Sequence, residues 1–206
     1  MSSAWWRRNR AWLIALPFLL ALALLASSQR LINSYLPWEP YIAVTVRDGE
    51  IDFRQRQRLS DGQEFERRVH VRLLGVTQTE EFDGIIASDG ATLWRVDLEF
   101  EAAPDQLLDP CTIELVANNV RYSAKAGKEL ATSSNWRASL TTIRCVPQDT
   151  PGPKIEAFTT NVKENTPPRP TQWSNSAALA LPTGVTPESL MLWWSTPEYL
   201  LFPLDL

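Results

Sequence analysis

TLWRVDLEFE, residues 92–101, has the most regular alternation of apolar and polar side chains in the sequence. Its even positions from Trp94 to Phe100 are apolar, and its odd positions from Arg95 to Glu101 are charged. Because successive side chains of a strand point to opposite faces of a sheet, this period of two predicts a β-strand. Trp94 is expected to face a hydrophobic core.

Two Asp-Gly pairs upstream of this stretch predict two hairpins. Asp48-Gly49 separates the β-branched and apolar residues 41–46 from residues 51–58, and Asp61-Gly62 separates residues 51–58 from residues 64–76. Within the last segment, apolar and basic side chains alternate, with Val69, Val71 and Leu73 set against Arg68, His70 and Arg72. One face of this strand is therefore expected to be buried and the other to be wet.

Further strand-like segments follow downstream. Residues 111–122 and 136–146 are predicted strands joined by a polar loop at 123–135. Three more apolar segments, separated by proline-containing turns, lie at residues 177–181, 189–195 and 199–204. About eight to ten strands with turn signals between them, and no amphipathic helix of good length, predict an all-β fold. The expected architecture is an antiparallel β-sandwich over residues 41–206.

The N-terminal part has a different character. Residues 11–28, AWLIALPFLLALALLASS, carry no charge and follow Arg7, Arg8 and Arg10. As a helix they would span about 27 Å, close to the roughly 30 Å hydrocarbon layer of a bilayer. The basic residues before the run place the N-terminus in the cytoplasm.

The domain organisation follows from this segment. Residues 1–10 are predicted to be a cytoplasmic basic tail, 11–28 a transmembrane signal-anchor and 29–40 a tether. Residues 41–206 would then be an extracytoplasmic domain of a single-pass cell-membrane protein, with the lipid bilayer as one partner. A cleaved signal peptide ending near residues 26–28 is the alternative, because it has the same order of basic, apolar and small residues.

Charge and cysteine content agree with export. All 24 acidic residues but only 16 of the 20 basic ones follow residue 30, so that part carries a net charge of −8. Because nucleic-acid binding depends on basic side chains that neutralise phosphates, no nucleic-acid partner is expected. The two cysteines of an exported domain, Cys111 and Cys145, are predicted to form a disulfide, since they have neither a CxxC spacing nor nearby histidine ligands.

The sequence contains no motif that announces catalysis. His70 is the only histidine, and its neighbours Arg68 and Arg72 disfavour the imidazolium that a general base must form. No catalytic residue, metal or cofactor is expected. Acidic groups at Asp48, Glu50 and Asp52 and at residues 80–89 leave calcium binding as an alternative to an ordinary solubilising role.

Two clusters are candidate binding residues. Arg54, Arg56 and Arg58 share one face of a predicted strand and are candidate anion ligands for a wall polymer. The hairpin partner adds three basic residues, Arg67, Arg68 and Arg72. The alternative is a charged edge hairpin that prevents aggregation, with Asp52, Glu64 and Glu66 as local partners.

The second cluster is Trp193 and Trp194 with Leu192, a candidate surface for a partner protein. Adjacent residues of a strand point to opposite faces, so one indole can be exposed while the other is in the core. The alternative is that both faces are covered.

Four segments resemble a family of immunoglobulin-like domains of unknown function found in exported or membrane-anchored proteins of Gram-positive bacteria. They are WRVDLEFEA (94–102), VRYSA (120–124), ALALPTGVTPESLMLWWS (178–195) and YLLFPL (199–204). Trp94, Arg121, Tyr122, Leu181 and Pro182 stand at positions comparable with the family's pattern, over about residues 92–206. The resemblance implies an immunoglobulin-like sandwich used in the cell envelope, with no settled biochemical activity.

The expected function is a membrane-anchored extracytoplasmic binding or accessory module of the cell envelope. Its partner would be an envelope protein or a wall polymer. Two alternatives stay open, namely an envelope hydrolase or transferase that uses acidic residues, and an accessory subunit of a transporter or secretion system.

Overall fold

The computed structural model describes residues 5, 9, 12, 15–25, 39–58, 62, 64–123, 131–133, 145–155, 162–163 and 167–206. The chain divides into two units, Met1–Pro40 and Tyr41–Leu206. In the first unit, residues 15–25 form a helix whose apolar side chains are exposed. Of the helices that the structure describes, none has the length and apolar character needed to cross a membrane. Residues 11, 13, 14 and 26–28 of the expected span lie outside the described part.

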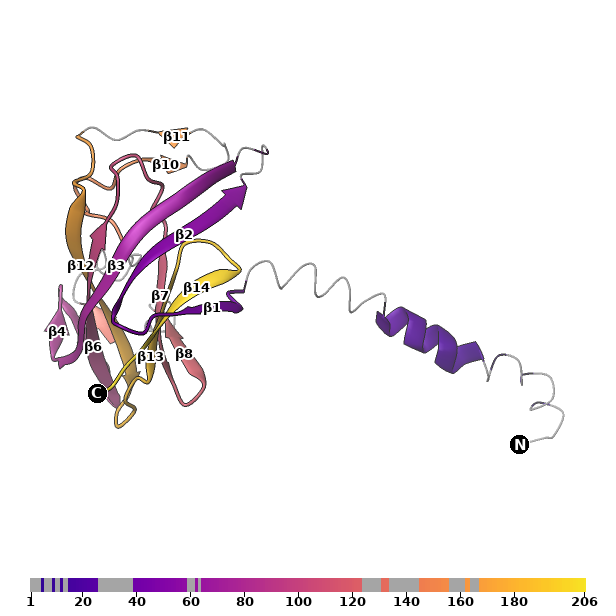
Figure 1. The fold of residues 1–206 in the computed structure, drawn as a ribbon. Helices are drawn as coiled ribbons and strands as arrows, with labels where there is room; N and C mark the ends of the chain where they lie inside the picture. Colours follow the sequence, from indigo (N-terminus) through magenta and orange to yellow (C-terminus); the bar gives the residue numbers. More distant parts are fainter. Residues whose placement is uncertain are drawn as a thin grey trace. The chain divides into compact units, whose positions relative to one another are not determined.

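The second unit is an all-β fold, as predicted, and its two larger sheets are seen in Figure 1. The four-stranded sheet has the order β12 (Gln172–Pro182), β6 (Ala91–Glu101), β3 (Glu64–Thr79) and β2 (Glu50–Arg58). The five-stranded sheet has the order β1 (Ile42–Thr45), β14 (Glu198–Pro203), β13 (Ser189–Trp193), β7 (Thr112–Ala117) and β8 (Val120–Ser123).

Two small sheets complete the described strands. The first joins β4 (Glu81–Phe82), β5 (Ile85–Ala87) and β9 (Ala131–Ser133), and the second joins β10 (Lys154–Ile155) and β11 (Val162–Lys163). β9 lies within the segment 123–135 that was expected to be a loop. Most of the strand predicted over 136–146 lies outside the described residues.

The core lies between the two larger sheets. β6 alternates as predicted, with Trp94, Val96, Leu98 and Phe100 all buried, so the expectation for Trp94 is confirmed. Phe53 of the four-stranded sheet stacks on Trp194, which directly follows β13, with ring centroids 5.8 Å apart. Apolar side chains from both sheets thus form one hydrophobic cluster.

One of the two predicted hairpins is correct and the other is wrong. β2 and β3 pair antiparallel from Glu50–Arg72 to Arg58–Glu64, as the second Asp-Gly pair indicated. β1 does not pair with β2; it pairs in parallel with β14, with Ile42 beside Glu198, 156 residues away in sequence. The Asp48-Gly49 turn, with φ +74° at Gly49, instead carries the chain from one sheet to the other.

This pairing corrects the expected architecture in one respect. The β1–β14 pair is parallel, while the other strand pairs of the described residues are antiparallel. A local Asp-Gly signal specifies a reversal of the chain, but the partner of a strand is chosen by non-local packing.

The strand predicted over 111–122 is a hairpin of β7 and β8 in the structure. Asn118 and Asn119 form its turn with φ +50° and +61°. Asparagine is one of the few side chains that adopts positive φ readily, so the Asn-Asn pair was the missed signal.

Candidate binding surfaces

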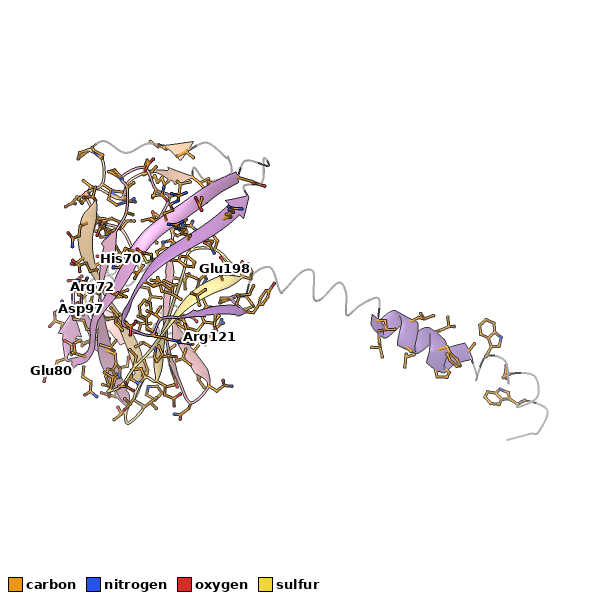
Figure 2. All side chains as sticks on the ribbon, in the orientation of Figure 1. His70, Arg72, Glu80, Asp97, Arg121 and Glu198 are labelled. Atoms are coloured by element: carbon orange, nitrogen blue, oxygen red, sulfur yellow. A yellow bond between two sulfur atoms is a disulfide. The ribbon has the colours of Figure 1, made fainter. Side chains whose placement is uncertain are left out.

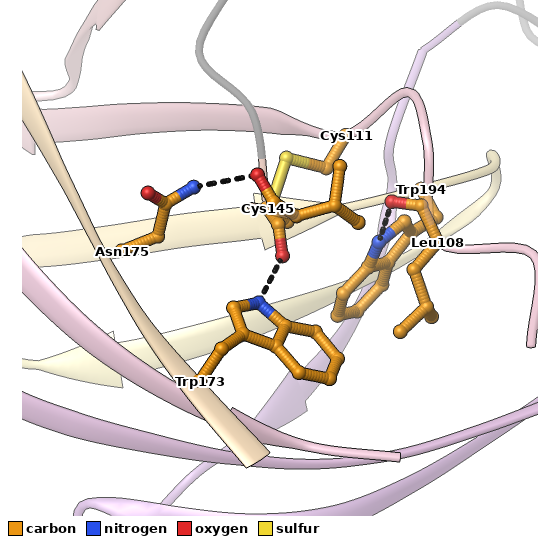
Figure 3. Close-up of a disulfide and its surroundings, with 7 residues drawn as sticks. Leu108, Cys111, Cys145, Trp173, Asn175 and Trp194 are labelled. Carbon is orange, nitrogen blue, oxygen red and sulfur yellow. Dashed lines mark hydrogen bonds between the residues drawn. A yellow bond between two sulfur atoms is a disulfide. The ribbon is translucent and has the colours of Figure 1, made fainter. Parts of the chain in front are cut away.

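The predicted disulfide is present and lies among buried, hydrogen-bonded residues (Figure 3). Cys111 and Cys145 are bonded with their Cα atoms 5.9 Å apart, and both residues are buried. The Trp173 indole donates a 2.9 Å hydrogen bond to the Cys145 carbonyl, and the Asn175 amide donates one of 3.2 Å to the Val146 carbonyl. These bonds hold the chain after Cys145 against β12.

Arg169 holds the same region from the other side. Its guanidinium donates to the carbonyls of Ala103 (2.8 Å), Gln106 (3.1 Å) and Pro151 (3.2 Å), and lies 4.7 Å from the Trp173 ring centroid. Burial lowers the pKa of Arg169 to about 10, so it stays protonated at neutral pH. It is a structural clamp between loops.

The outer face of the four-stranded sheet is charged, and several of its charges are paired within a strand or with a neighbouring strand. Arg72 donates to Glu50 (2.7 Å) and Glu99 (3.2 Å), and the bond to Glu50 raises the pKa of Arg72. Arg95 donates to Asp97 at 2.8 Å. His70, Arg72 and Asp97 are labelled in Figure 2. Such rows of opposite charges stabilise a solvated sheet face.

His70 has carboxylate neighbours that the sequence interpretation missed. Its Nδ1 lies 2.9 Å from Asp52 Oδ1, and Glu101 is its register partner on β6. The signal was the register of the β2–β3 hairpin, which sets residue 52 opposite residue 70. Within the described part of the chain, no hydroxyl or thiol hydrogen-bonds to His70.

Two of the three acidic residues at 48–52 contact cationic or titratable side chains of β3. Glu50 binds Arg72, and Asp52 contacts His70. Among the described residues, no group of three or more His, Cys, Asp or Glu side chains is placed to hold a metal ion.

Arg54 and Arg56 lie on the exposed face of β2, at the edge of the four-stranded sheet. Neither makes an ion pair or a hydrogen bond with a described residue. The pKa of Glu66 is lowered mainly by its hydrogen bond from Arg68, and the charges of Arg54 and Arg56 lower it further. Arg58 occupies the last position of β2, and its side chain lies outside the described residues.

The predicted basic stripe therefore needs a correction. Arg67 is only 5% exposed and points into the protein, because position 67 shares the inner face of Val69 and Val71. Arg68 and Arg72 are paired with carboxylates. Among the described side chains of this set, Arg54 and Arg56 remain without an ion pair.

Arg67 organises a buried polar network beneath the β2 edge. Its Nε donates to the Leu107 carbonyl at 2.8 Å and its Nη1 to Gln55 Oε1 at 2.5 Å. Gln55 Nε2 donates to the Ser195 carbonyl at 2.8 Å, and Ser195 Oγ donates to Gln57 Oε1. Burial lowers the pKa of Arg67 to about 10, which leaves it protonated at neutral pH.

The predicted tryptophan cluster is divided between core and surface. Leu192 is fully buried, and Trp194 is 8% exposed with its indole bonded to the Leu108 carbonyl at 3.0 Å. Trp193 is partly exposed on the opposite side of β13. Leu192 and Trp194 are thus core residues and do not form the expected surface patch, because even positions of β13 face the other sheet.

Trp193 has different neighbours on the outside. We call "the apolar face" the outward side chains Val116 of β7, Met191 and Trp193 of β13, and Tyr199 and Leu201 of β14. Met191 lies in register with Leu201, and apart from the buried Met191 these side chains are partly exposed. Glu114 and Arg121, paired at 3.0 Å, lie beside them on β7 and β8.

Comparison with protein-family models, with curated proteins and with solved structures finds no match to this chain.

Proposed function

We propose that the protein is a membrane-anchored extracytoplasmic binding or accessory module of the cell envelope that acts without catalysis. Its partner is an envelope protein, which includes the case of a subunit of a transporter or secretion system. The anchor would be residues 11–28, and the binding unit residues 41–206.

Two observations support the location. The helix at 15–25 exposes apolar side chains all round, with Leu16, Phe18 and Leu22 each more than 60% exposed, as expected of a helix that is buried in lipid. The disulfide of the second unit is typical of an oxidising compartment. Both agree with a cytoplasmic N-terminus and an exported β-rich unit.

The observation that carries the binding role is the difference between the two outer sheet faces. The outer face of the four-stranded sheet carries charged side chains, several of them paired, such as Arg72 with Glu50, and is suited to water. The apolar face on the five-stranded sheet carries aromatic and aliphatic side chains instead. Interface cores are rich in Trp, Tyr and Met, so the apolar face is the better docking surface.

An immunoglobulin-like topology belongs to the same proposal. Two packed sheets of five and four strands and a buried disulfide are compatible with it, and the segments that resemble the family supply Trp94 to the core. Loops and sheet faces of such sandwiches commonly carry binding rather than catalysis.

Site-specific crosslinking tests the docking role. A photoreactive amino acid placed at position 193 in intact cells should crosslink to one identified envelope protein, whereas the same residue at Arg95, on the charged outer face, should not. The variant Trp193→Lys should then fail to co-purify with that protein. Equal crosslinking from positions 193 and 95, or normal co-purification of the variant, would exclude the apolar face as the docking surface.

Fractionation tests the anchor. Peptides from residues 1–10 should be found in the membrane fraction after alkaline extraction, because a spanning helix resists removal. Their absence from the mature protein would favour the cleaved signal peptide.

The hydrolase or transferase alternative has one supporting observation. Asp52 and His70 face a surface hollow of about 470 Å³ that Glu101 and Thr171 also line. If this hollow were catalytic, His70→Gln should abolish turnover of a wall substrate while the protein stays folded. An unchanged rate would eliminate His70 as the acid or base.

A further inference from the structure

A groove of about 390 Å³ runs along the edge of the four-stranded sheet. Arg54 and Arg56 of β2 line one side, and residues 195–198, which connect β13 to β14 and include the first residue of β14, line the other. Glu66 contributes a carboxylate to the same groove. This site includes none of the residues of the apolar face and does not depend on the function proposed above.

The arginines of this groove differ from the other arginines on the same sheet face. Arg68, Arg72 and Arg95 each bind a carboxylate. Arg54 and Arg56 bind none among the described residues, and Arg54 stands directly opposite Arg68 in the register of β2 and β3. Like charges directly opposite each other destabilise a sheet, and an external anion would relieve that repulsion.

A third cation lies behind the groove wall. Arg67 is buried against Phe65 and Trp194, and its hydrogen-bond acceptors are carbonyl, amide and hydroxyl oxygens, all uncharged. A buried charge without a counter-ion acts at longer range than a solvated one, because less solvent screens it. Within the groove itself, Arg54 and Arg56 share their surface with two carboxylates, Glu66 and Glu198, and Glu66 is already bound to Arg68.

The groove is held in shape from both sides. Gln55 Nε2 binds the Ser195 carbonyl at 2.8 Å, and Gln57 accepts from the Ser195 hydroxyl. The backbone N–H groups of Tyr41 and Ile42 both donate to the Pro197 carbonyl, at 2.9 and 3.0 Å. A preformed site loses less conformational entropy when it binds.

From this geometry we propose that the groove binds the phosphate or carboxylate groups of a linear anionic polymer. Arg54 and Arg56 are two residues apart on one strand, so their Cα atoms are about 7 Å apart and point the same way. Each guanidinium can hold one anionic group by forked hydrogen bonds. Two cations held at a fixed distance can bind two neighbouring groups of a repeating polyanion, whereas a single small ion would engage fewer of their donors.

The test uses the full chain in non-ionic detergent with two probes, polyglycerol phosphate and polygalacturonate, and with neutral dextran as a control polymer. The variant Arg54→Gln/Arg56→Gln should bind the preferred anionic probe about tenfold more weakly than the wild type. The matched control Arg72→Gln/Arg95→Gln removes the same charge from the same sheet face and should change affinity by less than about threefold.

The two anionic probes distinguish the chemical source. Binding of polyglycerol phosphate alone identifies a phosphodiester polymer, and binding of polygalacturonate alone identifies a carboxylate polymer. Either result, or binding of both, supports the site. Binding of neither probe, or equal loss in the two double variants, would overturn it.

A variant that strengthens binding provides a further test, because unfolding of the variant cannot explain stronger binding. Glu198→Gln removes a carboxylate from the groove and should strengthen binding of the same probe, while Glu80→Gln, outside the groove, should leave it unchanged. If both variants alter binding equally, the effect is one of net charge and the groove is not the site.

Discussion

Arg67 and Arg169 place guanidinium groups in the interior of the β-rich unit, where both donate to neutral oxygen atoms and Arg169 Nε has no hydrogen-bond partner among the described residues. A buried cation is tolerated only where its hydrogen bonds are well placed, since removing it from water is costly. These side chains therefore act as fixed supports. Arg169 connects the loops at residues 103–106 and 151, and Arg67 connects β3 to the segment after Trp194.

Gly152 lies against the Arg169 guanidinium, and this contact predicts how much stability is lost when a methyl group is added by Gly152→Ala. Gly152 and Gly184 have nearly equal φ values, +80° and +82°, so Gly→Ala strains the backbone equally at both. At Gly152 a Cβ would also lie 2.8 Å from Arg169 Nη1, whereas at Gly184 it meets no atom within 4 Å. Gly152→Ala should lower the free energy of unfolding by about 1–3 kcal/mol more than Gly184→Ala does.

Guanidinium chloride unfolding of the two glycine variants measures this difference. Equal losses would mean that Arg169 moves away without cost and does not act as a rigid clamp.

At the scale of elements, the β7–β8 hairpin depends on its two-residue turn. Asn118 and Asn119 both have positive φ, the backbone conformation of a type I′ turn, in which Asn-Gly is the preferred pair. Asn119→Gly should therefore raise Tm by about 1–3 °C, and Asn119→Ala should lower it. Thermal unfolding followed by circular dichroism measures the Tm of both variants. A lower Tm for the glycine variant would contradict the turn geometry.

β6 and β1 show how far local pattern determines an element. β6 was predictable because a strand with one buried face must alternate, and both its bounds and its inner face follow from that alternation. β1 was recognised as a strand, but its parallel pairing with β14 was not. Closing a loop of about 150 residues to form that pair leaves no trace in the local sequence.

At the scale of the molecule, the disulfide is the one covalent link between distant parts of the β-rich unit. It closes a loop with a sequence separation of 34 residues. In the chain-entropy treatment, such a link stabilises the folded state by about 3–4 kcal/mol, because it restricts the unfolded chain. Cys111→Ala/Cys145→Ala should lower the free energy of unfolding by about that amount.

Denaturant unfolding of the double cysteine variant, beside the oxidised wild type, provides the measurement. Wild type unfolded in the presence of reductant serves as the control and should resemble the variant. If the variant and the oxidised wild type have the same midpoint, the disulfide contributes nothing to stability.

The sequence by itself determined the all-β class, the inner faces of β3 and β6, the β2–β3 hairpin and the disulfide. Each of these follows from a local alternation of apolar and polar side chains, from a turn signal or from the cysteine pair. The tertiary structure alone decided that Trp194 lies inside, that Trp193 lies outside, and that Arg54 and Arg56 lack carboxylate partners among the described residues. Those outcomes depend on which strands pair and in what register, and pairing is settled by packing between segments far apart in the chain.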